Sequence, residues 1–129
     1  MIFTLVVHSA PYSSEAPASA FRFAKAALAG GHSIYRLFFF GDGVHNANRL
    51  TVVAQDDVNW QTQWDALIAE HNLDSVVCVS SAIKRGVLNE SESTRHELDA
   101  VSLADNTQIA GLGQLVDAAL QSDKVINFG

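Results

Sequence analysis

Apolar residues in this chain form unbroken runs that alternate with stretches of helical spacing. The runs are rich in β-branched and aromatic residues and span residues 2–8, 33–40 and 73–81. A run without polar alternation is typical of a strand covered on both faces, as in a parallel sheet. Between the runs, apolar residues recur every three or four positions over residues 14–30 and 59–72, which predicts two helices. The resulting β-α-β-α-β order favours a doubly wound sheet with right-handed crossovers.

Turn and capping residues predict the elements of the last third. Asn89 followed by Glu92 fits a capping box, so we expect a helix that begins there and runs to about Ala104. Further elements follow in order: a short strand at 107–110, a helix that begins near Gly113, and a closing strand at 124–128. The sequence therefore predicts one α/β domain over residues 1–129, with three α/β/α layers and a mostly parallel sheet of about five strands.

The connections of the predicted sheet carry few signs of a nucleotide site. Asn46 and Val116 stand where the third glycine of a dinucleotide fingerprint would fall after the glycine pairs at 41–43 and 111–113. The 9–14 loop has hydroxyl groups but no glycine. A flavin or nucleotide module stays open as an alternative, which a yellow colour or a phosphate bound at this loop would support. Residues 44–57 form a long connection, and loops of that length are usually functional or interfacial.

Composition and charge narrow the functional class. With 129 residues, of which 48% are hydrophobic and 17% charged, the chain can bury a core without disulfides. The single cysteine and the absence of a Cys/His cluster at zinc spacing favour a reducing, cytoplasmic setting with no metal and no cofactor. A formal charge of −6 argues against direct nucleic-acid binding, and no apolar run is long enough to span a membrane or serve as a signal peptide.

Cys78 is the candidate reactive residue. It lies in the last third of the 73–81 run, and ligands of open α/β sheets gather beyond the carboxyl ends of strands. Lys84 and Arg85 follow closely, and nearby cations favour the nucleophilic thiolate. His45, in the long connection, is either a surface residue or a charge partner that helps to ionise the thiol. The alternative for Cys78 is a small buried hydrophobe with no chemistry.

Four segments together resemble the TusD/DsrE family of sulfurtransferase subunits. They span residues 19–24, 38–48, 77–87 and 111–115, so the resemblance extends over essentially the whole chain. Its most telling part is the cysteine strand followed by a basic residue pair, Gly86 and Val87. One departure is Lys84, at a position where the family often has arginine. Lysine keeps the charge but loses the planar fork that binds a carboxylate in two places.

The resemblance implies a sulfur relay. TusD-like proteins take sulfane sulfur from a small TusA-like carrier as a persulfide on the residue that Cys78 matches. They pass it to a TusE-like acceptor for formation of 2-thiouridine at the tRNA wobble position. The resemblance also implies a heterohexamer with homologous TusC-like and TusB-like subunits. DsrE relatives act similarly in dissimilatory sulfur oxidation.

The residues add one constraint to that relay. Because the chain has no second thiol, a persulfide on Cys78 can be released only to a thiolate of another protein. The competing hypothesis is a non-catalytic scaffold subunit. A Cys78→Ser variant that still supports sulfur transfer would select the scaffold.

Overall fold

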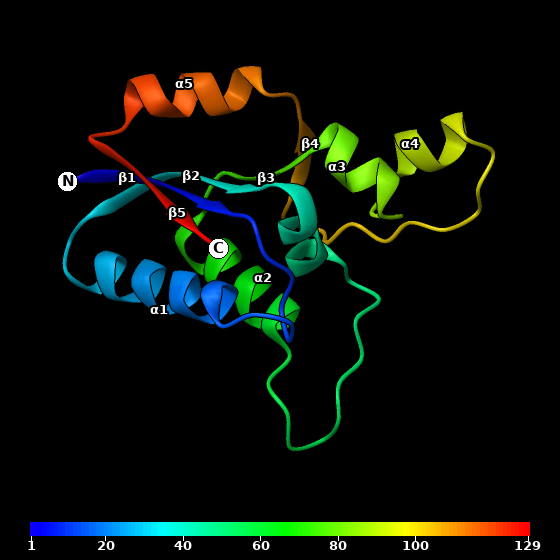
Figure 1. Cartoon of the computed structure of the whole chain (residues 1–129), viewed down its shortest axis with the longest axis horizontal. Coiled ribbons are helices and arrows are strands. Elements are labelled where there is room, and N and C mark those ends of the chain that lie inside the picture. Colours follow the sequence, from blue (N-terminus) through cyan, green and yellow to red (C-terminus); the bar gives the residue numbers. More distant parts are fainter.

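The computed structural model describes all 129 residues and contains five strands and five α-helices. The strands are β1 (Ile2–Val7), β2 (Ser33–Phe39), β3 (Ser75–Cys78), β4 (Gln108–Ala110) and β5 (Lys124–Phe128). The helices are α1 (Ala16–Ala29), α2 (Trp60–His71), α3 (Val79–Lys84), α4 (Glu90–Arg95) and α5 (Gly113–Gln121). A 3₁₀ helix, η1 (Gly41–Ala47), follows β2 (Figure 1).

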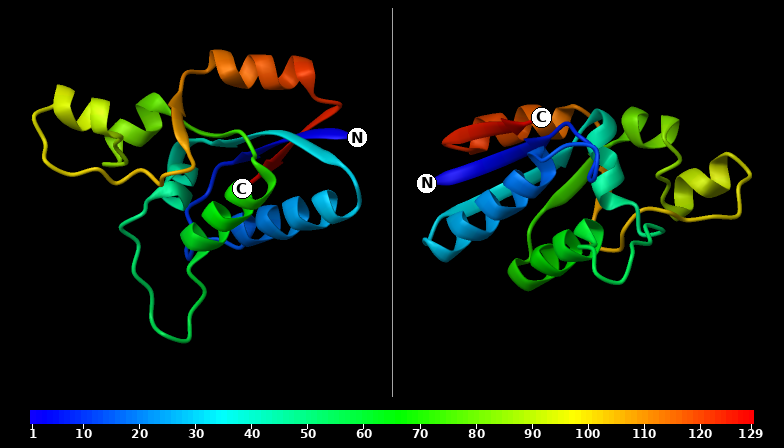
Figure 2. Two further views of the ribbon diagram at one scale, coloured as in Figure 1. Left: turned by 180° about the vertical axis from the view of Figure 1, so that it is seen from behind. Right: turned by 60° about the horizontal axis from the view of Figure 1, so that its bottom comes forward.

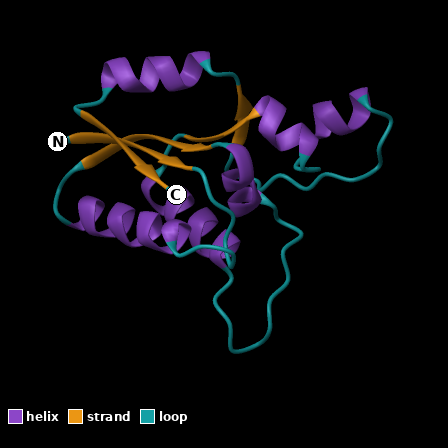
Figure 3. Cartoon of the chain, in the orientation of Figure 1, coloured by secondary structure: helices purple, strands orange, loops and turns teal.

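All five strands are parallel and lie in the order β4-β3-β2-β1-β5. Helices α1 and α2 cover one face of the sheet and α5 covers the other (Figure 3). The predicted fold class is thus confirmed, and the sheet is parallel throughout. In such a sheet the carboxyl ends of all strands meet at one edge, which places the ends of β1, β2 and β3 beside one another.

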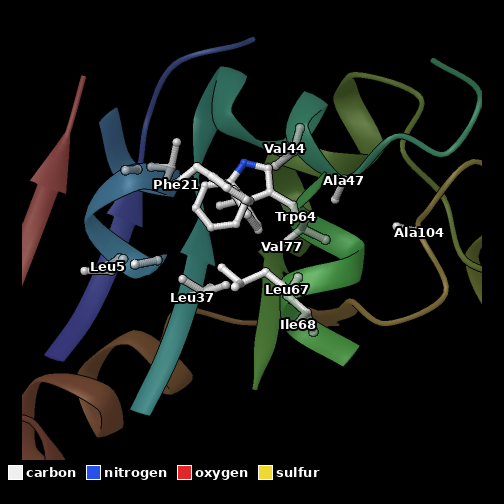
Figure 4. Packing of buried hydrophobic residues seen from close by; sticks show 14 of the residues in the cluster. Leu5, Phe21, Leu37, Val44, Ala47, Trp64, Leu67, Ile68, Val77 and Ala104 are labelled. Atoms are coloured by element: carbon white, nitrogen blue, oxygen red, sulfur yellow. The ribbon is translucent and has the colours of Figure 1, made fainter. Parts of the chain in front are cut away.

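The larger core fills the space between the sheet and helices α1 and α2. Phe21 of α1 packs edge-on against Trp64 of α2, with ring centroids 5.2 Å apart, and Val77 of β3 lies in the same cluster (Figure 4). Trp64 is only 1% exposed, so it is part of this core. The side chains of β1, β2 and β3 that point to the other face of the sheet pack beneath α5. Both faces of these strands are therefore buried, which explains why their apolar runs are continuous.

Asparagine residues cap both ends of α2. The Asn59 side chain accepts the Thr62 N–H at 3.2 Å, and Asn72 closes the helix in the left-handed conformation, with φ 51°. At the start of α1, Glu15 occupies the N-cap position, and the Ser14 hydroxyl accepts the Ala16 N–H.

The predicted strand at 73–81 is too long. Strand β3 ends at Cys78, and Val79 begins the helix α3. An apolar run has no marker for the residue at which the backbone changes from extended to helical, because Val suits both a buried strand and a buried helix start.

The predicted helix from Asn89 to about Ala104 is also too long, because α4 ends at Arg95. The Asn89 cap is correct, since its side chain accepts the Glu92 N–H at 2.8 Å. Glu97 then adopts a left-handed conformation, with φ 56°, and the chain turns back toward the body of the protein. Leu103 pairs with Asn48 in an isolated antiparallel bridge.

The long connection after β2 is partly ordered as η1, which the sequence pattern did not predict. Its remainder, residues 48–59, extends away from the layers (Figure 1). Helix α3 lies beyond the carboxyl edge of the sheet and contacts η1, and α4 lies farther out (Figure 2).

Arg36 of β2 links α5 to the sheet through hydrogen bonds and ion pairs. Its guanidinium binds Asp74 at 2.7 Å and donates to the Gln114 carbonyl at 2.6 Å and to Asp117 at 3.3 Å. Because the Arg36 side chain is buried while both carboxylates are half exposed, the contacts orient α5 without burying unpaired charge. Helix α5 is thereby held against the face of the sheet to which the Cys78 side chain points.

Candidate functional site

Cys78 is the last residue of β3 and occupies the N-cap position of α3. Its backbone is extended, with φ −63° and ψ 126°, and the helical conformation starts at the next residue. The cysteine therefore stands at the carboxyl edge of the sheet, where the fold class places reactive groups.

The Cys78 side chain points to the face of the sheet that α5 covers. It packs in a small cluster with Val6, Phe38 and Val76, and Leu115 of α5 packs against that cluster. The residue is 4% exposed, so the thiol is almost covered in the isolated chain. An apolar hollow of about 400 Å³ adjoins the cluster. Val6 of the cluster and Leu115, which packs against the cluster, both line this hollow.

Two opposing effects set the acidity of this thiol. Burial acts to raise the pKa of Cys78, whereas the N–H and O–H groups of Ser81, followed by those of Ser80, act to lower it. The polar groups prevail, and the pKa lies below that of an ordinary cysteine. A lowered pKa increases the thiolate fraction near neutral pH, and the thiolate is the nucleophile in sulfur exchange.

The predicted supporting cations do not pair with the sulfur. Lys84 is exposed and forms no ion pair. Arg85 turns toward η1, where its Nε donates to Asp42 at 2.8 Å and its Nη1 donates to the Ser81 carbonyl at 3.1 Å. Arg85 therefore contacts the first turn of α3, whose Ser81 and Ser80 act on the pKa of Cys78.

His45 lies half-buried in η1 and makes no hydrogen bond to Cys78. The hydrogen bond from Arg85 lowers the pKa of Asp42, and the charges of Arg85 and then His45 add to that effect. The structure thus brings His45 and Arg85 together around Asp42.

Sequence reasoning missed Ser80 and Ser81. Serines in a short segment after a strand are common, and no sequence pattern marked the start of α3 at Val79. Had that start been recognised, positions two and three residues after Cys78 would have been the first-turn positions nearest the sulfur.

Other features of the surface give little support to further chemistry. A hollow of about 590 Å³ lies beside the 12–15 loop and includes Arg22 and Trp60, but it is on the α1 and α2 side of the sheet. No three His, Cys, Asp or Glu side chains gather closely enough to hold a metal ion. None of the helices has the length and apolar character needed to cross a bilayer.

The model of the DsrE/DsrF-like family matches residues 1–128 of the chain. The chain belongs to this family. A protein of Allochromatium vinosum named putative sulfurtransferase DsrE is 46% identical over 129 residues, which cover 100% of this chain and 99% of the relative. A sulfurtransferase TusD homolog of Aliivibrio fischeri is 42% identical over 128 residues, covering 99% and 98% of the two chains.

Comparison with solved structures supports the fold. The crystal structure of the ychN protein from E. coli superposes with a TM-score of 0.80 and covers 99% of both chains. Its sequence identity of 24% makes this a likeness of fold alone.

Proposed function

We propose that this protein is a sulfurtransferase subunit that carries sulfane sulfur as a persulfide on Cys78. The observation that carries the proposal is the position of the only cysteine, which ends β3 beside polar groups that lower its pKa. Relatives at 46% and 42% identity over the whole chain are named sulfurtransferases, which supports sulfur transfer as the general activity.

In the accepting step, the Cys78 thiolate attacks the outer sulfur of a persulfide on the donor protein. A bond forms between Cys78 Sγ and that sulfur, the bond to the donor cysteine breaks, and the donor cysteine leaves as a thiolate. In the release step, an acceptor thiolate attacks the outer sulfur and Cys78 leaves as a thiolate. Both steps exchange one thiolate for another, so neither step needs an oxidant or a reductant.

The partners in this proposal are a TusA-like donor, a TusE-like acceptor and homologous TusC-like and TusB-like subunits in a heterohexamer. The product pathway is 2-thiouridine formation at the tRNA wobble position, in the cytoplasm. Because Cys78 is 4% exposed, docking of the donor has to uncover the sulfur. Exposed Lys84 is available to a carboxylate of the docked partner, whereas Arg85 and His45 act through Asp42.

Intact-mass measurement after incubation with a persulfide-loaded TusA-like carrier tests the proposal. We expect the mass to increase by one or more sulfur atoms, the increase to disappear with reductant, and Cys78→Ser to show no increase. The chain has no other cysteine, so no second thiol can account for the gain. An unchanged mass with a demonstrably loaded carrier would contradict the proposal.

Two observations favour second candidates. The 46% identity to the DsrE relative favours an equivalent role in dissimilatory sulfur oxidation, which failure to restore wobble thiolation in a TusD-deficient strain would support. The near-complete cover of Cys78 favours a non-catalytic scaffold subunit. Full sulfur transfer by an assembly that contains Cys78→Ser would establish the scaffold.

A further inference from the structure

We propose that helix α5 docks against the α5 of a second copy of this chain, through an apolar stripe that points away from the sheet. The α5 stripe consists of Leu112, Val116, Ala119 and Leu120, which recur at positions i, i+4, i+7 and i+8. That spacing is typical of the side of a helix that is buried in a folded protein. The contact concerns only how two copies of the chain meet, so it does not depend on sulfur transfer.

The exposure of α5 is the reverse of that expected for a helix on a protein surface. All four residues of the stripe are exposed, with Val116 at 59% and Leu120 at 79%. The sheet side of the helix instead carries the fully buried Ala118 and the carboxylate of Asp117, which pairs with Arg36 at 3.3 Å. No other element covers the outer side of α5 (Figures 1 and 2). A cluster of exposed apolar side chains of this kind marks an interaction surface.

A hollow beside the stripe makes this surface complementary to itself. Leu112 and Ala119 of the stripe line the apolar hollow of about 400 Å³, together with Leu115 and with Val125 of the edge strand β5. Leu120 follows Ala119 and projects from the helix next to this hollow. A contact across a two-fold axis uses the same patch on both copies, so each copy can place its leucine in the hollow of the other.

Charge identifies a second copy as the occupant of this surface. The chain has a formal charge of −6, so two copies repel each other unless they meet where no free carboxylate lies. The only charged residue within 111–122 is Asp117, which Arg36 neutralises. Leu98, by contrast, is exposed but lies between two acidic residues. A basic partner would find no charge to bind on the stripe, whereas the same stripe of a second copy matches it.

The size of the surface sets the strength of the expected contact. Helix α5 has nine residues and β5 has five. Stable interfaces use about 20–30 residues on each side. We therefore expect a weak and reversible dimer, with a dissociation constant in or above the micromolar range.

Sedimentation equilibrium of the full chain tests the contact, without any partner protein and with a reductant that keeps Cys78 from forming a disulfide. The protein concentration would extend from about 10 to about 500 μM, which suits an interface of this strength. We expect the weight-average mass to rise with concentration from 13.9 kDa toward twice that value.

Variants locate the contact on the stripe. Val116→Glu and Leu120→Glu each bring a carboxylate against its own copy, so each should weaken the association by at least about tenfold. Val52→Glu is the matched control, because Val52 is 91% exposed in the 48–59 segment and lies outside the stripe. It should leave the association unchanged. All three positions are exposed, and circular dichroism would verify that each variant is folded.

The salt dependence separates an apolar contact from one made by ion pairs. Raising the NaCl concentration from about 0.05 to about 0.5 M screens the repulsion between two negatively charged copies. An apolar contact should therefore become stronger, and weakening of the dimer by salt would overturn the inference.

A chain that stays monomeric at every concentration would also overturn the inference. So would a dimer that persists in both stripe variants, or one that Val52→Glu weakens equally. A chain that is monomeric alone and gains mass only with a TusC-like or TusB-like subunit would reject the second copy in favour of that subunit. Sulfur uptake by a strictly monomeric chain rejects this contact alone, whereas a stripe-dependent dimer that takes up no sulfur rejects the carrier role alone.

Discussion

Substituting Gly43 by alanine should force η1 away from β1. Gly43 is buried in η1, and a Cβ atom built on it would lie 1.9 Å from the Val7 carbonyl oxygen and 2.7 Å from the Val7 carbonyl carbon. Both neighbours are backbone atoms of the buried strand β1, so no side-chain rotation relieves the overlap.

The size of the effect follows from the required movement. Cβ atoms essentially never approach other heavy atoms closer than 3.0 Å, so the two segments have to separate by about 1 Å at Gly43. The Phe40 N–H donates to the same Val7 oxygen at 3.0 Å, and that bond would be strained as well. Backbone displacement in a packed core costs up to about 3 kcal/mol, a large share of a typical net stability of about 5–15 kcal/mol.

Urea unfolding followed by circular dichroism measures this loss. Gly113→Ala is the matched control, because Gly113 begins α5, is exposed and has no heavy atom within 4 Å of the built Cβ. We expect Gly43→Ala to lower the unfolding free energy by about 3 kcal/mol, and Gly113→Ala to raise it by about 0.5–1 kcal/mol. A Gly43→Ala midpoint equal to that of the unchanged protein would refute the packing of η1 on β1.

Two further predictions concern titrating groups. The hydrogen bond to Asp117, with desolvation and the Asp117 charge, raises the pKa of Tyr35. Asp117→Asn should lower that pKa toward its ordinary value in an ultraviolet titration on a Tyr12→Phe background, and an unchanged titration would contradict the contact. The hydrogen bond and charge of Arg85 lower the pKa of Asp42, so their pair stabilises the fold above the ordinary carboxyl pKa and is lost as pH falls through the lowered pKa. Asp42→Asn should therefore reduce the loss of stability between about pH 4 and pH 2, whereas an identical acid profile would show that the pair contributes nothing.

The sequence predicted the fold class because the signals for it are local and repeated. Continuous apolar runs identified β1, β2 and β3, and apolar residues at helical spacing over 59–72 identified α2. Each of these features depends on neighbouring residues in the chain, so the pattern contains the information.

The errors lie where contacts between distant segments decide the backbone. Helix α4 ends at Arg95, and the chain beyond it is held by long-range bonds, including the Leu88 N–H to the Ser102 hydroxyl at 2.9 Å and the Leu103 bridge to Asn48. The start of α3 at Val79 is supported in the same way by the bond from Gly41 to Ser81. A helical pattern cannot predict such partners.

The candidate site was predicted only in part for the same reason. The candidate position, Cys78, followed from one cysteine near the end of a strand. The groups around it did not, because spacing along the chain suggested Lys84 and Arg85, whereas the fold turns Arg85 toward Asp42, and groups of Ser81 and then Ser80 act to lower the pKa of the thiol. The surroundings of Cys78 thus depend on the contact between α3 and η1, which lie far apart in the sequence.

Release of sulfur from Cys78 to an acceptor tests the central claim most directly. The protein would be loaded with radioactive sulfur from a persulfide donor, freed of the donor, and mixed with a TusE-like acceptor. We predict that the label moves to the acceptor cysteine in step with its loss from Cys78, and that Cys78→Ser neither loads nor delivers label. Label that reaches the acceptor equally well through Cys78→Ser, or that stays on Cys78 in the presence of a competent acceptor, would contradict the account.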